Sequence, residues 1–186
     1  MRSSAASDVY KRQHQYNEHL LRAEYMNTTA NTTRIRWWIA GLMWLAIAIN
    51  YIDRTVLSAA APHLIDELKL DPEMMGFIMA AFFWSYSLLQ IPAGWFADRF
   101  GQKKGLGLAV AWWSIATSMM GVATGFKSLL ALRLALGVGE AAAYPSNAGI
   151  AARWFPDKER ATVSGLFDSA SKFGGAIAMP LSLIHI

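Results

Sequence analysis

Long apolar segments constrain this sequence more strongly than any other feature. Four of them are complete, and a fifth begins at Ala161 and runs to Pro180. A helix needs about 20 mostly apolar residues to cross the hydrocarbon core of a bilayer, and in lipid a helix satisfies its own backbone hydrogen bonds. The sequence therefore predicts an all-α membrane fold with about five transmembrane helices, at 34–60, 74–97, 105–123, 128–152 and 161–180.

Composition and charge narrow the range of functions. The chain is 54% hydrophobic, carries a formal net charge of +4 and contains no cysteine. The lack of cysteine excludes thiol chemistry, disulfides and cysteine-based metal sites. No basic stripe with interleaved aromatic residues is present, which argues against a nucleic-acid partner. No histidine cluster, nucleophile elbow or phosphate-binding loop is present either, so the sequence predicts neither an enzyme nor a metal or organic cofactor.

The two ends of the chain are related at the level of DNA. Back-translation of Asp8–Gln13 as GAT GTG TAT AAG AGA CAG gives a reverse complement that translates as Leu181–Ile186. This inverted repeat resembles the transposase end used in sequencing libraries, so we expect 1–13 and 181–186 to be translated adaptor. On this interpretation the natural stretch, 14–180, is cut off at both sides. The polar segment 14–33 is expected to be a cytoplasmic tail.

The distribution of basic residues predicts the orientation in the membrane. The loops 98–104 and 153–160 each hold three Lys or Arg residues, and Arg34 and Arg36 stand at the start of the first span. The alternate loops hold only Lys69 and Lys127. Because loops rich in Lys and Arg stay in the cytoplasm, we expect the N-terminal tail and both basic loops to lie on the cytoplasmic side.

The loop between the second and third spans has an ordered pattern of glycines and charges. Gly94 removes a side chain where another helix can pack closely, and Gly101 permits a sharp reversal of the chain. Asp98 ends a helix, where a carboxylate is unfavourable against the helix dipole unless it has a partner. We expect Arg153 to be that partner. The alternative is an ordinary basic loop; the pattern consists of Gly94, Asp98, Arg99, Gly101, Lys103 and Lys104.

Charged residues inside the first and fourth spans are candidate functional groups. Asp53 and Arg54 are adjacent, so they point about 100° apart on a helix and must find different partners. Arg133 and Glu140 lie two turns apart on one face of the fourth span. An ionisable residue inside a membrane is costly and is therefore a functional candidate. The alternatives are solvation at the outer edge for the first pair and a purely structural ion pair for the second.

Weaker signals lie in the second and fifth spans. Tyr86 and Gln90 are one helical turn apart and share a face, although aromatic-rich membrane helices carry tyrosine routinely. Asp168 and Lys172 have the i, i+4 spacing that permits an ion pair within a helix. They can equally be two charges on the helix surface near the cytoplasm.

Together these residues resemble a known family. The segments INYIDR, AFFWSYSLLQIPAGWFADRFGQKK, LRLALGVGEAAAYPSN and WFPDKERATVSG are similar to the anion:cation symporter branch of the major facilitator superfamily, which includes galactonate, glucarate and hexuronate transporters. The resemblance covers Arg34 to Pro180 and implies twelve helices in two six-helix halves, a central site and alternating access. This chain would be the N-terminal half, about five of the expected twelve spans.

The resemblance also implies roles for individual residues. Arg54 would bind the substrate carboxylate with help from Tyr86 and Gln90. Asp53 and Glu140 would take up the coupling proton, and Arg133 would pair with Glu140. Ser171 stands where sugar-acid members can place a polar amide, and Lys172 is a candidate contact for a second anionic group. These last two residues depart from the galactonate pattern.

The implied function is proton-coupled import of an organic anion, most simply a sugar acid such as a hexonate, hexarate or hexuronate. The proton would be the coupling ion, and the protein would be a monomer in a bacterial inner membrane. The alternatives are another major facilitator activity, such as aromatic acid uptake or drug efflux, or a short membrane scaffold if the ends are genuine. A buried guanidinium argues against efflux of apolar drugs.

Overall fold

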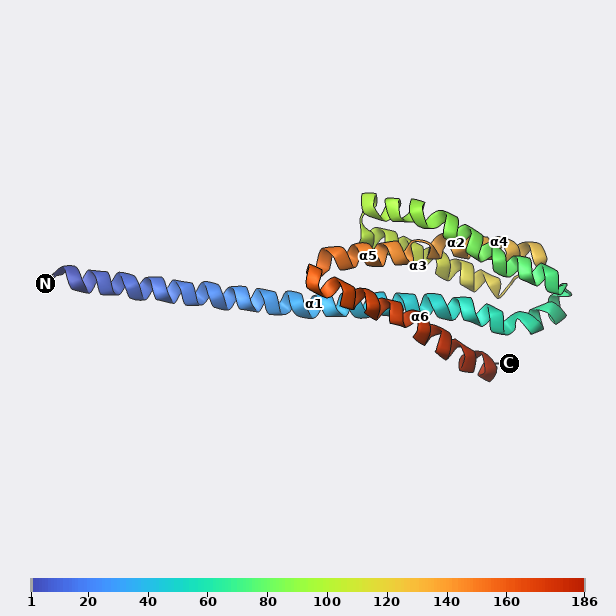
Figure 1. Cartoon of the computed structure of the whole chain (residues 1–186), viewed down its shortest axis with the longest axis horizontal. Coiled ribbons are helices and arrows are strands. Elements are labelled where there is room, and N and C mark those ends of the chain that lie inside the picture. Colours follow the sequence, from blue (N-terminus) through green and yellow to red (C-terminus); the bar gives the residue numbers. More distant parts are fainter. Residues whose placement is uncertain (1, 186) are drawn as a thin grey trace. The chain divides into compact units, whose positions relative to one another are not determined.

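The computed structural model describes the backbone of residues 2–185 and the side chains of residues 34–178 and 180. Every element within these residues is an α-helix, which confirms the predicted all-α class. The described helices are drawn in Figure 1: α1 (Arg2–Leu68), α2 (Pro72–Phe100), α3 (Gln102–Met120), α4 (Phe126–Glu140), α5 (Ala143–Trp154) and α6 (Asp157–His185).

The chain divides into two compact units, residues 1–39 and 40–186. The first consists of the N-terminal part of α1, and the second contains the rest of the chain. The segments 1–13 and 181–186, assigned above to adaptor sequence, and the expected tail 14–33 lie outside the residues whose side chains are described. Their origin and role stay predictions.

Two of the described helices are long and apolar enough to cross a membrane, namely residues 34–68 of α1 and the whole of α2. The α1 helix continues past Ala60, the predicted end of the first span, and passes through Pro62 to Leu68. The α3 helix begins with Gln102, Lys103 and Lys104, which lower its mean hydropathy.

The predicted fourth span is divided between two helices. The α4 helix ends at Glu140 and α5 begins at Ala143. Pro145 explains the break, because a proline lacks an N–H and its ring clashes with the carbonyl group four residues earlier, here that of Ala141. Glu140 therefore lies at the end of a helix, next to a change in backbone path.

The α4 helix packs against both α2 and α3, and small residues make this close approach possible. A Cβ atom on Gly137 would lie 2.6 Å from the carbonyl oxygen of Phe82 in α2. A Cβ atom on Gly139 would lie 2.7 Å from Trp112 in α3. A Cβ atom on Gly174 of α6 would lie 2.5 Å from the carbonyl oxygen of Ala48 in α1. Glycine at these positions lets the helix backbones touch.

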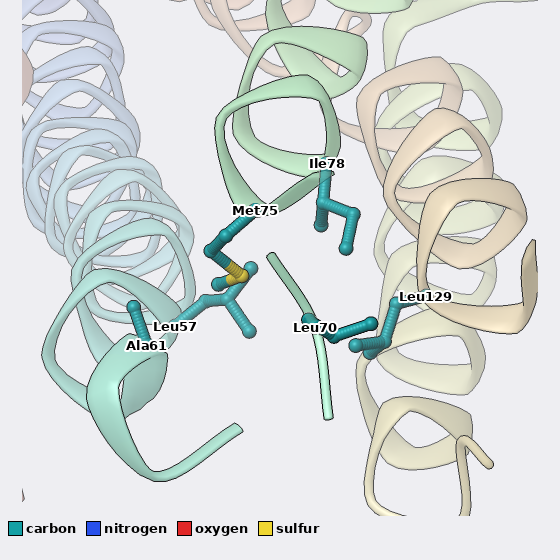
Figure 2. Close-up of a cluster of buried hydrophobic side chains, with 6 residues drawn as sticks. All are labelled: Leu57, Ala61, Leu70, Met75, Ile78 and Leu129. Carbon is teal, nitrogen blue, oxygen red and sulfur yellow. The ribbon is translucent and has the colours of Figure 1, made fainter. Parts of the chain in front are cut away.

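A cluster of buried apolar side chains joins α1, α2 and α4 near the connection between α1 and α2. Figure 2 shows its members converging from these helices, with Leu70 contributed by the connection itself. This packing holds the C-terminal part of α1 against α2 and α4. The six residues are Leu57, Ala61, Leu70, Met75, Ile78 and Leu129.

The outward faces of α2 and α3 are strongly apolar. Large hydrophobic side chains are exposed along both helices, which is unfavourable in water and favourable in lipid. Faces of this kind are suited to contact with lipid. The exposed residues include Phe83, Trp84, Leu88, Ile91 and Trp95 on α2, and Leu108, Trp112, Ile115 and Met119 on α3.

Candidate functional site

An ion pair between α1 and α4 forms the centre of the site. The Nε atom of Arg54 lies 2.7 Å from Oε2 of Glu140, and the Glu140 side chain is fully buried. The Arg54 side chain is 14% exposed, so this guanidinium group reaches the boundary of the buried region. Arg54 projects from α1, and Glu140 is the last residue of α4.

Three aromatic rings surround the Arg54 guanidinium. Its Cζ atom lies 4.8 Å from the ring centroids of Tyr51 and Phe82 and 4.4 Å from that of Tyr86. Phe82 and Tyr86 are stacked on each other, with centroids 5.6 Å apart. Aromatic faces attract a cation and restrict its movement. The predicted residue Tyr86 therefore does lie beside Arg54.

Arg133 does not form the predicted ion pair with Glu140. Its side chain is buried, and its guanidinium carbon lies 4.9 Å from the ring centroid of Phe82. Seven residues along a helix correspond to a rise of about 10.5 Å, so Arg133 and Glu140 share a face but are not neighbours. Arg54, approaching from another helix, is closer to the carboxylate of Glu140.

Asp53 and Arg54 have different partners, as their spacing predicts. The hydroxyl group of Thr117 in α3 donates a hydrogen bond to Oδ2 of Asp53 at 3.4 Å. Asp53 thus faces α3 while Arg54 faces α4. Thr117 was not among the predicted residues, because a threonine in an apolar helix carries no distinctive sequence signal.

Several polar atoms around the ion pair are buried and have no hydrogen-bond partner. They are Nη2 of Arg54, Nε and Nη1 of Arg133, and Oε1 of Glu140. A buried polar group without a partner is energetically costly, so such atoms mark a place where a polar ligand or ordered water can bind. The two arginines offer donors, and Glu140 offers an acceptor.

Asn50 is a further polar residue that sequence reasoning missed. It is fully buried, and neither its amide nitrogen nor its amide oxygen has a partner. It lies one turn before Arg54 on α1 and shares its face. An asparagine within a long apolar segment was the available signal.

The loop between α2 and α3 matches the predicted geometry at its glycines. A Cβ atom on Gly94 would lie 3.3 Å from Cβ of Pro145, so α2 approaches α5 closely there. Gly101 has a φ of 96°, a conformation that glycine adopts readily. Arg99 lies over the ring of Trp95, 5.9 Å from its centroid. Lys103 and Lys104 are exposed.

The predicted partner of Asp98 is wrong in this structure. Oδ1 of Asp98 accepts a hydrogen bond from Nε2 of Gln102 at 2.7 Å, and Arg153 is exposed near the end of α5. Gln102 follows four residues after Asp98, on the first turn of α3, so the sharp reversal at Gly101 brings it within reach. The local turn supplies the hydrogen bond that the more distant arginine was expected to provide.

The predicted residues of the fifth span are arranged differently from expectation. Asp168 accepts a hydrogen bond from the hydroxyl group of Tyr144 at 3.2 Å, and no ion pair with Lys172 occurs among the described side chains. Ser171 is buried and donates to the backbone carbonyl of Asp168 at 2.7 Å. Lys172 is exposed, and Gln90 of α2 is half-buried.

The part of the chain with described side chains holds no group of three or more His, Cys, Asp or Glu residues suited to a metal ion. The chemistry of the site is that of the buried Arg133, the mostly buried Arg54, two carboxylates and aromatic rings. Such a set can bind a carboxylate bidentately through a guanidinium.

Known proteins resemble this chain over most of its length. The family model described as Major Facilitator Superfamily matches residues 43–185. A probable galactarate/D-glucarate transporter of Bacillus subtilis is 40% identical over 156 residues, which are 80% of this chain and 34% of that protein. A D-galactonate transporter of Escherichia coli O6:H1 is 38% identical over 152 residues, covering 82% of this chain and 35% of that protein.

A solved structure has the same arrangement of helices. It is a bacterial homolog of the human lysosomal transporter Spinster in an inward-facing, unoccupied conformation, with a TM-score of 0.74 and 31% sequence identity. The match covers 77% of this chain and 30% of that one. The chain therefore spans about a third of the length of the curated relatives and of the solved protein that it matches.

Proposed function

Since this chain belongs to the Major Facilitator Superfamily, we propose that the whole protein imports an organic anion, specifically a sugar acid, together with protons. Substrate and protons would cross the membrane by alternating access. The proposed substrates are hexonates, hexarates or hexuronates.

The surroundings of Arg54 carry this proposal. Its Nε atom is held by Glu140, while its Nη2 atom is buried and has no hydrogen-bond partner. The three aromatic rings hold the guanidinium plane in place. A positioned guanidinium with unused donors is suited to a carboxylate. An exporter of apolar drugs has no need of such a group inside the membrane.

The charge balance of the site supports coupling to protons. Arg54 and Arg133 offset Asp53 and Glu140 when both carboxylates are ionised. A bound organic anion then adds an uncompensated negative charge in a region of low dielectric, which is unfavourable. Uptake of one proton by Asp53 or Glu140 for each substrate carboxylate restores neutrality. Proton and anion would therefore enter the site together.

The substrate class and membrane setting rest on the relatives. Two of them are named as transporters of galactarate, D-glucarate or D-galactonate, and both are bacterial. We place this protein in the bacterial inner membrane as a monomer, with its N-terminus in the cytoplasm. The basic loops that follow the second and fourth spans support that orientation.

Uptake of radiolabelled hexonate and hexarate into right-side-out vesicles containing the whole protein tests this function. An inward gradient of one pH unit should raise accumulation about tenfold for each proton carried, because one unit corresponds to a factor of ten in proton activity. A proton ionophore should abolish that gain. Glu140→Gln should retain exchange of labelled for unlabelled substrate but lose the response to the gradient.

The outcomes separate the parts of the proposal. Uptake that ignores the ionophore would refute proton coupling and leave anion transport standing. A wild-type protein that takes up no organic acid above empty vesicles would refute the function itself.

A further inference from the structure

A second group of polar side chains lies where α1, α5 and α6 meet. The Tyr144 hydroxyl donates a hydrogen bond to Asp168 at 3.2 Å, and it also interacts with the side chain of Tyr51. The Tyr51 ring in turn lies 4.8 Å from the guanidinium carbon of Arg54. A continuous line of side chains therefore leads from Arg54 through the two tyrosines to Asp168 on α6.

Lys172 extends this line by one helical turn. It follows Asp168 at the i, i+4 spacing, so both side chains lie on neighbouring positions of the α6 surface. Lys172 is exposed, and no ion pair to it occurs among the side chains that the structure describes. Its ammonium group is therefore available to a ligand.

The depth of these charges shows what they must face. Asp168 and Lys172 follow Arg160, in the charged first turn of α6, by eight and twelve residues. At the helical rise per residue they lie about 12 and 18 Å further along the helix axis, well within a hydrocarbon core of about 30 Å. Charges at such depth face a watery cavity or other protein groups rather than lipid.

We propose that Lys172 binds the second carboxylate of a dicarboxylate substrate whose first carboxylate is held by Arg54. Asp168 and Tyr144 are positioning residues, because their hydrogen bond joins α6 to α5 and so fixes the helix surface that carries Lys172. This inference rests on the proposed function and adds a substrate preference to it, for hexarates over hexonates.

Hexarates and hexonates differ in the number of carboxylates, and this difference is what Lys172 would distinguish. A hexarate carries a carboxylate at both ends of a six-carbon chain, and a hexonate carries one. Arg54 serves both substrates. Only the hexarate presents a negative charge to Lys172, so loss of that lysine affects hexarate selectively.

Initial rates of hexarate and hexonate uptake, measured side by side with the whole protein in vesicles, test this inference. Lys172→Gln should raise the KM for hexarate by about tenfold or more, because a charge-assisted hydrogen bond is lost. The KM for hexonate should stay within about twofold. Lys172→Arg should restore hexarate uptake at least in part. Lys127→Gln, an exposed lysine at the start of α4, is the matched control and should change neither.

The positioning role of Tyr144 and Asp168 is tested by the preference of the protein for hexarate over hexonate. Tyr144→Phe and Asp168→Asn should lower the ratio of kcat/KM for hexarate to that for hexonate. A purely structural role would lower both values together and leave the ratio unchanged.

Each other outcome overturns the inference. Equal losses for both substrates in Lys172→Gln would make Lys172 structural, and no loss would place it outside the site. A wild type that transports hexonate but not hexarate would refute the second subsite while the proposed function stands. A wild type that transports neither substrate would refute the proposed function, and the inference with it.

Discussion

Arg54 combines a strong ionic contact with donors that remain unused. Lysine at this position keeps the positive charge but loses the planar fork that grips a carboxylate and stacks on Tyr51, Phe82 and Tyr86. We expect Arg54→Lys to raise the KM for hexonate and hexarate alike, by about 10- to 100-fold. Competition uptake assays measure this. Arg34→Lys, at an exposed position, should have no effect, and normal uptake by Arg54→Lys would remove Arg54 from the site.

Individual residues also show which parts of the site can be predicted from the sequence and which cannot. Asp53, Arg54 and Glu140 stand out because ionisable groups are rare in apolar segments. The partners of these residues cannot be identified from the sequence, because the contact of Arg54 with Glu140 joins helices that are far apart in the chain. The spacing of Arg133 and Glu140 suggested a pair within one helix, and the real partner came from another. Tyr144 carries no unusual charge and was not noticed.

At the scale of helices, the contact between α2 and α4 depends on Gly137. A Cβ atom there would lie 2.6 Å from the carbonyl oxygen of Phe82, so the backbones would have to separate. We expect Gly137→Ala to destabilise the protein by about 1–3 kcal/mol and to lower its thermal unfolding temperature in detergent.

Gly107 provides the matched control for this helix contact. It lies in α3, and a Cβ atom at that position would meet nothing within 4 Å. Gly107→Ala should be neutral or stabilising by up to about 1 kcal/mol, because alanine favours a helix over glycine. Equal unfolding temperatures for the two variants would contradict the close packing of α2 and α4.

The helices also show the limits of hydropathy. Apolar length predicted a helix within α1 and helices close to α2 and α3, because it measures what lipid requires of a helix. It predicted one uninterrupted fourth span and missed the division into α4 and α5. Pro145 was the signal, since a proline inside a helix disrupts the preceding turn. Apolar length also did not show which helices pack closely at Gly137 and Gly139.

For the whole molecule, the orientation in the membrane can be measured directly because the sequence contains no cysteine. We expect a single cysteine introduced by Lys103→Cys to react with a membrane-impermeant thiol reagent only in inverted vesicles, where the reagent can reach the cytoplasmic face. Lys127→Cys should react from the opposite side, because α3 separates the two positions. Labelling intact cells and inverted vesicles compares the two sides. Reaction of both cysteines from one side would contradict the proposed topology.

The length of α2 has a mechanical consequence. Its 29 residues extend about 43 Å, whereas the hydrocarbon core is about 30 Å thick. The helix therefore has a surplus of about 13 Å, which it accommodates by tilting or by reaching into the headgroup regions. A span with this slack can change its angle to the bilayer without drawing either end into the hydrocarbon. The helix bearing Phe82 and Tyr86 can thus rock while the membrane around it keeps its thickness.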